Sequence, residues 1–342
     1  MWRAVAVLAA ALSVAGCGLF NPKRTISVPQ PLGPLAEADM PRLFDEINRL
    51  GGIRSLNGKV DIQFLDNSYA ECGLADKYRT ADGRLVAQRP GQIYLIVQVP
   101  VIGTKVAEMS SNGERFWAGI YAGDSKYQRF VRGTNSAQYE RLEANGGSLS
   151  PDCAAGGRRR EAAMQRATVS ALSSLRPQHL TDAVLVPPVS FDDTTHVYAQ
   201  AESFEEEADP RPGARKDARV VRGYYLLTEL RMLGQNRARV TRRFWFDRVG
   251  GVRLARVQSY DERGRLVTDV VYSNPQNFGG EGSAARRLPA QVELTRPQER
   301  YAIRIAFQDP GAVRVDAPYD PEVFVLKNSS NLQEVDLDAR KP

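Results

Sequence analysis

The chain has 342 residues, of which 42% are aliphatic or aromatic, so it can bury a large core in one β domain or in two smaller ones. Its 46 lysines and arginines exceed its 40 aspartates and glutamates, but this surplus is spread along the sequence. The densest basic run, Arg158-Arg159-Arg160, lacks interleaved aromatic residues and reads as a solvated helix end. The composition therefore argues against a nucleic-acid partner.

Residues 1–16 predict an export signal that is removed. One positive charge, Arg3, precedes an apolar run at 4–12 that is shorter than the roughly 20 residues of a membrane-spanning helix. The residues Val14-Ala15-Gly16-Cys17 resemble the lipobox of bacterial lipoproteins, which implies cleavage before Cys17 and acylation of its sulfur. The alternatives are an ordinary secretory signal with an incidental cysteine, or an apolar run kept as a membrane helix.

Residues 17–36 predict an acylated cysteine followed by a semi-extended tether, because four prolines interrupt any periodicity. Two or more acyl chains anchor a protein stably, at about 0.8 kcal/mol per buried methylene. Gly18 stands where many lipoproteins retained at the inner membrane have aspartate. The lipobox resemblance therefore implies a lipid-anchored protein at the periplasmic face of the outer membrane.

Residues 37–337 are expected to form one domain. It begins with a helix, since Pro41 lies in the first turn, Gly51-Gly52 follow the end, and apolar residues recur at helical spacing between them: Met40, Leu43, Phe44, Ile47 and Leu50. Segments 59–64 and 92–99 alternate apolar and polar residues and predict strands with one apolar face. Asp82-Gly83 and Asn112-Gly113 predict hairpin turns in an antiparallel meander that extends to residue 132.

Residues 133–193 interrupt the strand pattern. A polar, glycine-rich stretch at 135–157 precedes one helix face that ends before Pro177 and consists of Met164, Thr168, Ala171, Leu172 and Leu175. Helical material inserted into a meander usually covers one face of the sheet. We therefore expect a helical lid at about 133–193.

Strands resume after the insertion, at 194–204, 220–231, 239–247, 252–260, 266–272, 291–295 and 301–307. The charged segment 205–219 and the segment 274–287 predict solvated loops. Residues 224–227 and 244–246 are apolar on both strand faces, so helices are expected to cover one face there. The fold class is α+β, with mostly antiparallel strands.

Catalytic and metal-binding residues are not expected. The two histidines, His179 and His196, lie far apart and have no ligand at metal spacing, and no nucleophile turn or phosphate-binding loop is present. A distant acid pair such as Asp61 and Glu108 could still converge in an envelope hydrolase. Apart from Cys17, the cysteines are Cys72 and Cys153, which an exported compartment permits either to pair or to remain free.

One motif order resembles the lipoprotein-localisation carriers LolA and LolB. Gly83 to Tyr94 contains their glycine, Arg-Pro and apolar strand, and Ser111 to Trp117 is similar to their Ser-Asp-Gly hairpin and Leu-Trp strand. Segments 246–272 and 320–337 are similar to their later strands and their C-terminal end. The resemblance implies an incomplete, half-open barrel of about eleven strands, with helices over its concave apolar face.

The resemblance also implies site residues. Arg89 matches a carrier arginine that helps to hold the lid, although it could equally be a surface arginine. Ile93 matches an aromatic cavity residue, and Leu95 and Val97 continue the same strand face. Val101 and Ile102 stand where LolB presents an apolar loop that inserts into the bilayer; the alternative is packing under the barrel rim.

The sequence therefore predicts a non-enzymatic, membrane-anchored periplasmic lipoprotein without a cofactor. It would hold acyl chains of a lipoprotein or lipid in an apolar half-barrel cavity, for transfer or insertion at the outer membrane. The alternative is a structural or sensor lipoprotein of the envelope that uses the same fold to bind a protein partner.

Overall fold

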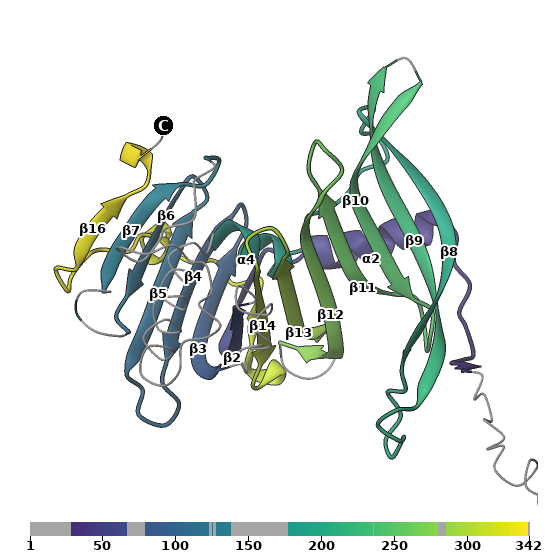
Figure 1. Cartoon of the computed structure of the whole chain (residues 1–342), viewed down its shortest axis with the longest axis horizontal. Helices are drawn as coiled ribbons and strands as arrows, with labels where there is room; N and C mark the ends of the chain where they lie inside the picture. Colours follow the sequence, from purple (N-terminus) through teal and green to yellow (C-terminus); the bar gives the residue numbers. More distant parts are fainter. Residues whose placement is uncertain are drawn as a thin grey trace, which may run out of the picture.

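The computed structural model describes residues 29–66, 79–122, 125, 128–137, 177–234, 236–279 and 285–340. Strands dominate this part of the chain and form a single large sheet (Figure 1). Its main path runs β1-β9-β10-β11-β12-β13-β14-β2-β3-β4-β5-β6-β7-β16, with β8 paired to β9 and β15 paired to β2. The two ends of this path do not meet, so the sheet is open.

The strands are β1 (Gln30–Pro31), β2 (Ser55–Asp66), β3 (Arg79–Gln88), β4 (Gln92–Gln98), β5 (Lys105–Asn112), β6 (Arg115–Ile120), β7 (Arg129–Thr134), β8 (His196–Ala208), β9 (Arg219–Gly234), β10 (Arg237–Asp247), β11 (Arg253–Tyr260), β12 (Leu266–Phe278), β13 (Arg286–Arg296), β14 (Tyr301–Phe307), β15 (Arg314–Val315) and β16 (Gln333–Asp336). The α-helices are α2 (Met40–Gly51) and α4 (Pro177–Val184), and the short 3-10 helices are η4 (Pro310–Ala312), η5 (Pro321–Phe324) and η6 (Asp338–Arg340).

The sheet agrees with the expected class of mostly antiparallel strands, since in the described part of the chain only β1 with β9 and β16 with β7 pair in parallel. Its sixteen strands among the described residues exceed the eleven implied by the family resemblance. Three of them, β1, β15 and β16, are two to four residues long. Such strands are too short to produce an alternating pattern that a sequence can reveal.

Helix α2 forms where its sequence predicts. Asp39 caps the first turn by accepting the N–H of Arg42 at 3.1 Å, and Gly52 closes the last turn by donating to the carbonyl of Asn48. Its apolar stripe is buried, and Phe44 packs edge-to-face against Tyr198 of β8. In Figure 1 the helix lies across the β9–β11 part of the sheet.

One face of the sheet, here called the inner face, is apolar over most of its length. Paired strands continue it in register, and its residues belong to one core cluster that also includes the stripe of α2. Representative members, in sheet order, are Tyr225, Leu227, Phe244, Phe246, Leu254, Val270, Val292, Leu294, Ile303, Ile305, Val60, Ile62, Leu85, Ile93, Leu95, Met109, Ala118, Val131 and Val335. The opposite face carries ion pairs such as Arg304 with Glu293 at 2.7 Å.

Helix α4 begins at Pro177, where the sequence predicts that a preceding helix ends. It packs against β3, β4, β5 and β13, and Leu180 and Ala183 are buried in the core. The hydroxyl of Tyr272 donates to the Ala183 carbonyl at 3.0 Å. The helix predicted at 164–175 lies outside the described residues, as does most of the proposed lid.

The predicted hairpin turn at Asp82-Gly83 is wrong. Both residues lie within β3, and Asp82 pairs with Asp61 of β2 and Gln98 of β4. The glycine serves close approach instead, because a Cβ at Gly83 would lie 2.5 Å from the Ile96 carbonyl oxygen. The predicted turn at Asn112-Gly113 is confirmed, since β5 ends at Asn112 and Gly113 has φ of 100°.

Two predicted loops are partly strand. β8 continues through three glutamates to Ala208, inside the segment predicted as the loop 205–219. β12 ends at Phe278 and β13 begins at Arg286, so both strands reach into the segment predicted as the loop 274–287. Among the described strands, β8 pairs only with β9, and its side chains are exposed or half-buried throughout. Charged residues on such an edge strand hinder pairing with another chain, which explains why the sequence looks like a loop.

The N-terminal residues 30–38 are fixed to the β8–β10 part of the sheet. The buried Arg248 donates to the Ala36 carbonyl at 3.1 Å and forms ion pairs with Glu37 at 2.7 Å and Glu202 at 2.6 Å. Its guanidinium also stacks on Tyr225. The predicted tether therefore ends at a firm attachment rather than at a loose linker.

Candidate functional site

Arg89 joins the ends of both helices. Its side chain donates to the carbonyl of Ile53, just beyond α2, at 2.8 Å and to the carbonyl of Val186, just beyond α4, at 2.6 Å. Burial lowers the pKa of Arg89, and the nearby carboxylate of Asp182 opposes this effect. The geometry suits an arginine that holds α4 against the sheet.

The three residues proposed to line a cavity lie on the inner face under α4. The exposed fractions of Ile93, Leu95 and Val97 are 0%, 2% and 8%, so the protein's own atoms cover them. Where α2, α4 and the sheet meet, a void of about 20 Å³ remains among Leu50, Ile53, Leu56, Val184, Val186, Phe278, Leu288, Pro289, Val292 and Phe307. The inner face is thus closed here, and an acyl chain would need α4 to move.

Val101 and Ile102 form the tip of the β4–β5 hairpin. Val101 is fully exposed and Ile102 is 76% exposed. Val101 also has φ of 69°, a left-handed conformation in which a β-branched side chain is strained. The tip therefore presents two apolar side chains to solvent, one of them at a conformational cost.

The three cysteines lie outside the described residues. Acylation of Cys17 and pairing of Cys72 with Cys153 therefore remain predictions.

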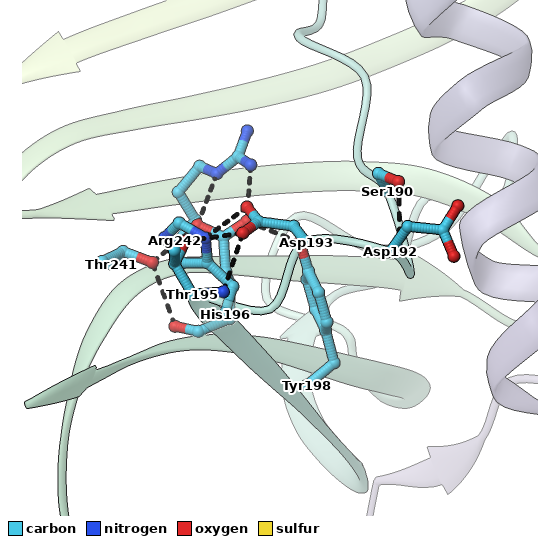
Figure 2. Close-up of polar contacts among 9 residues, drawn as sticks. Ser190, Asp192, Asp193, Thr195, His196, Tyr198, Thr241 and Arg242 are labelled. Atoms are coloured by element: carbon cyan, nitrogen blue, oxygen red, sulfur yellow. Dashed lines mark hydrogen bonds and ion pairs between the residues drawn. The ribbon is translucent and has the colours of Figure 1, made fainter. Parts of the chain in front are cut away.

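A polar cluster interrupts the apolar inner face near the start of β8 (Figure 2). Glu229 is almost fully buried and accepts hydrogen bonds from Tyr198 at 3.0 Å, Thr241 at 2.6 Å and two nitrogens of Arg242. Figure 2 labels these three donor residues. Burial raises the pKa of Glu229, but these bonds, above all that from Arg242, outweigh it and lower the pKa below its ordinary value. The sequence signal was weak, because Glu229 looks like any polar strand residue.

The loop before β8 contains the contact between His196 and Asp193, at 2.6 Å (Figure 2). Asp193 also accepts the N–H and the hydroxyl of Thr195, and these bonds, foremost the hydroxyl, lower its pKa to about 2. All three residues belong to one turn of four residues, which caps the start of β8. This arrangement organises the turn and points no nucleophile at a substrate.

Asp182 of α4 was missed by sequence reasoning. Its side chain is accessible to solvent, yet surrounding protein atoms desolvate the carboxylate and raise its pKa to about 6, against the attraction of Arg89 and Arg242. The sequence offers no signal for this, because α4 must first be placed between these two arginines.

A cavity of about 1270 Å³ opens where β11 and β12 separate. It is bordered by α2, the end of β8 and the start of β13, and it differs from the acyl cavity expected around Ile93. Arg286 and Arg287 line it, at the end of a segment predicted to be a solvated loop.

Within the described ranges, no cluster of three or more histidine, cysteine or acidic side chains is arranged to hold a metal ion. The same residues include no helix of the length and apolarity needed to cross a membrane.

Comparison with solved structures finds proteins whose chain fold is similar over most of this chain. No family model and no curated protein matches the chain. A LolA superfamily protein from Nitrosomonas europaea is 12% identical, with 84% of this chain and 99% of that chain covered and a TM-score of 0.39. A DUF1329 family protein from Desulfovibrio piger is 13% identical, with 85% and 97% covered and a TM-score of 0.42.

A putative outer membrane lipoprotein-sorting protein domain from Vibrio parahaemolyticus is also similar. It is 13% identical, with 85% of this chain and 96% of that chain covered and a TM-score of 0.40.

Proposed function

We propose that this protein is a non-catalytic lipoprotein, anchored through Cys17 at the periplasmic face of the outer membrane. It shelters acyl chains of a lipoprotein or lipid between its curved sheet and helices α2 and α4, and it delivers them to the bilayer.

The observation that carries this proposal is the extensive apolar inner face against which α2 and α4 pack. The residues of this face are buried in one core cluster that includes side chains of both helices, and Arg89 ties the ends of these helices together. Acyl chains that replace α4 on this face would remove methylenes from water, at roughly 25 cal/mol per Å² of apolar surface. Breaking the two Arg89 bonds would open the inner face.

The β4–β5 tip supports delivery to a bilayer. Exposing Val101 and Ile102 to water is unfavourable, and the left-handed backbone at Val101 adds about 1 kcal/mol or more. Insertion into the acyl region would recover the exposure penalty, so the tip is suited to approach a membrane.

Native mass spectrometry tests whether the protein carries acyl chains. The full chain with Cys17→Ala would be purified without detergent and offered a fluorescent palmitoyl probe. Co-purified lipid or bound probe supports the proposal. A clean apo mass with no uptake of the probe contradicts it.

A vesicle assay tests the role of the tip. The variant Val101→Asn with Ile102→Ser removes both apolar side chains and keeps a residue that tolerates positive φ. We expect it to retain the palmitoyl probe but to release it to vesicles at least about tenfold more slowly, because roughly 1.5 kcal/mol or more of apolar insertion is lost per side chain. The control, Met232→Ser with Leu233→Ser, removes two exposed apolar residues at the end of β9. Equal slowing by both variants would contradict a specific role of the tip.

The second candidate is a structural or sensor lipoprotein that binds a protein partner. The void of only about 20 Å³ among the packed core residues favours it, since a sheet filled by its own side chains needs no lipid. The absence of probe uptake in the first experiment would support this candidate.

A further inference from the structure

The hydrogen bonding between β11 and β12 stops before the two strands end, and the strands then separate. The last pair is Arg256 with Val271, beyond which β11 pairs only with β10, and β12 only with β13. The N–H of Leu254 lies past this point and donates to Glu46 of α2 at 3.3 Å. The cavity of about 1270 Å³ fills the resulting fork, and we call it the fork cavity. In Figure 1, β11 and β12 diverge at this end.

The walls of the fork cavity are charged, and some of the arginines that line it have no partner among the described residues. Seven arginines and five carboxylates line it. Each carboxylate has a partner: Glu46 with Arg49, Glu205 with Ser203, Glu206 with Arg219, Glu207 with Arg222, and Asp247 with Arg222. The exposed side chains of Arg42, Arg286 and Arg287 have neither a hydrogen bond nor an ion pair to any residue that the structure describes. Among the described lining residues, three arginines therefore have spare donors, whereas Glu205 is the one carboxylate without a cationic partner.

The three spare donors come from α2 and from the start of β13. Arg42 and Arg49 lie on α2, and Arg286 and Arg287 begin β13. Arg49 donates to the main-chain carbonyl of Arg287 at 2.7 Å, which holds α2 and β13 together at this wall. Guanidinium groups bind phosphate through paired N–H donors.

The floor of the fork cavity is apolar and continues toward the core. Leu50, Leu254, Tyr272 and Leu288 line it. Leu50, Leu288 and Pro289 also border the small void beneath α2 and α4. An amphiphile could therefore place a charged group against the arginines and its chains over Leu50 and Leu288, toward the inner face.

We propose that the fork cavity binds the phosphate of a phospholipid headgroup, with Arg286 and Arg287 as the main donors and Arg42 as a further cation of the lining. This inference rests on the proposed function and narrows it: the cargo is a phosphate-bearing lipid rather than an uncharged acylglycerol. Trp245 lines the same cavity, so its fluorescence should change when a lipid binds there.

Two lipids with the same chains test the inference. The full chain with Cys17→Ala would be titrated with dioctanoyl phosphatidylglycerol and with dioctanoylglycerol, which lacks the phosphate, and binding would be followed by tryptophan fluorescence and calorimetry. We expect the phosphate-bearing lipid to bind at least about tenfold more tightly, the difference that one charge-assisted pair supplies. Trp245→Phe should remove the fluorescence response and leave the calorimetric one.

The variant Arg286→Gln with Arg287→Gln should reduce the affinity for phosphatidylglycerol to that for dioctanoylglycerol. Its matched control, Arg237→Gln with Arg314→Gln, removes two exposed arginines outside the cavity and should leave both affinities unchanged. All four positions are exposed, so circular dichroism and the urea midpoint should match those of the parent chain.

The outcomes separate this inference from the proposed function. Equal affinity for the two lipids overturns the headgroup site and leaves acyl binding standing. Inorganic phosphate that binds as tightly as phosphatidylglycerol, with no binding of dioctanoylglycerol or the palmitoyl probe, overturns both proposals in favour of a site for free phosphate. An equal loss of affinity in the control variant would also overturn the assignment to Arg286 and Arg287.

Discussion

Arg89 connects parts of the chain that are distant in sequence. Its bonds reach the carbonyls that follow α2 and α4, which are 36 and 97 positions away. Both carbonyls lie where a helix has just ended, so neither has a helical partner to replace the arginine. One side chain thus sets the position of both helices against the sheet.

The variant Arg89→Leu keeps the apolar stem and removes both bonds. We expect the free energy of unfolding to fall by about 1–3 kcal/mol, because two partly buried carbonyls lose their donor. Hydrogen exchange should accelerate in α4 more than in α2, since α4 is the shorter helix. The control is Arg54→Leu, whose exposed side chain has no such contact. Urea denaturation and exchange mass spectrometry would check both, and unchanged exchange in α4 would contradict the proposed role of Arg89.

Val101 should limit stability at the β4–β5 tip. Its φ of 69° favours glycine or asparagine, and a β-branched residue is strained there. We expect Val101→Gly to raise the free energy of unfolding by about 1 kcal/mol, the relief of strain exceeding the added freedom of the unfolded chain. Urea denaturation measures this change. A lower stability would show that Val101 is not strained.

At the scale of single elements, helix α4 carries a carboxylate, that of Asp182, whose desolvation opposes the packing of the helix against the sheet. Leu180 and Ala183 bury one side of the helix, while Asp182 lies near Arg89 and Arg242 in a site that desolvates it. The apolar contacts hold the helix down, and the carboxylate is less stable there than in water. α4 is therefore an element whose attachment can depend on pH.

The pKa of Asp182 rises from 3.8 to about 6 in the folded protein, so the folded state favours the protonated acid. Its contribution to stability is fully present below pH 3.8 and is lost as the pH rises through 6. We expect Asp182→Asn to be more stable than the parent chain above pH 6, with the difference vanishing toward pH 3.8. Urea midpoints across this range test the prediction, and Asp45→Asn on α2 is the control. A constant difference at all pH values would contradict it.

At the scale of the whole molecule, one core extends through a sheet that is open at both edges. The core cluster includes residues of β9–β11 at one side and of β5–β7 at the other, with α2 and α4 packed against it. The hydrophobic contacts therefore cross the fork between β11 and β12 instead of dividing there. From this continuity we expect the sheet to unfold as one cooperative unit.

Unfolding should consequently be a single transition. Trp245 lies in β10 and Trp117 in β6, on opposite sides of the fork. The variants Trp117→Phe and Trp245→Phe each keep one of these two tryptophans. In each variant, the urea midpoint measured by fluorescence should equal the midpoint measured by circular dichroism. Midpoints that differ between the two probes would show that the sheet unfolds in two parts.

Local patterns in the sequence determined most elements of this protein. Alternation predicted most of the longer strands, and the apolar stripe with Pro41 and Gly52 predicted α2, because these signals depend on neighbours within one or two turns. Prediction failed at Asp82-Gly83 and at the glutamates of β8. There the conformation depends on strands that pack from elsewhere, and turn residues or charges give the opposite local signal.

The tertiary structure decided which residues meet. Arg89 and the β4–β5 tip could be proposed from a family resemblance, but the bonds of Arg89, the exposure of Val101 and the closed inner face required the packed helices. The fork cavity and the raised pKa of Asp182 had no sequence signal at all. The cavity arises where two strands separate, and the pKa shift arises from the protein atoms that surround a carboxylate. A linear sequence pattern records neither.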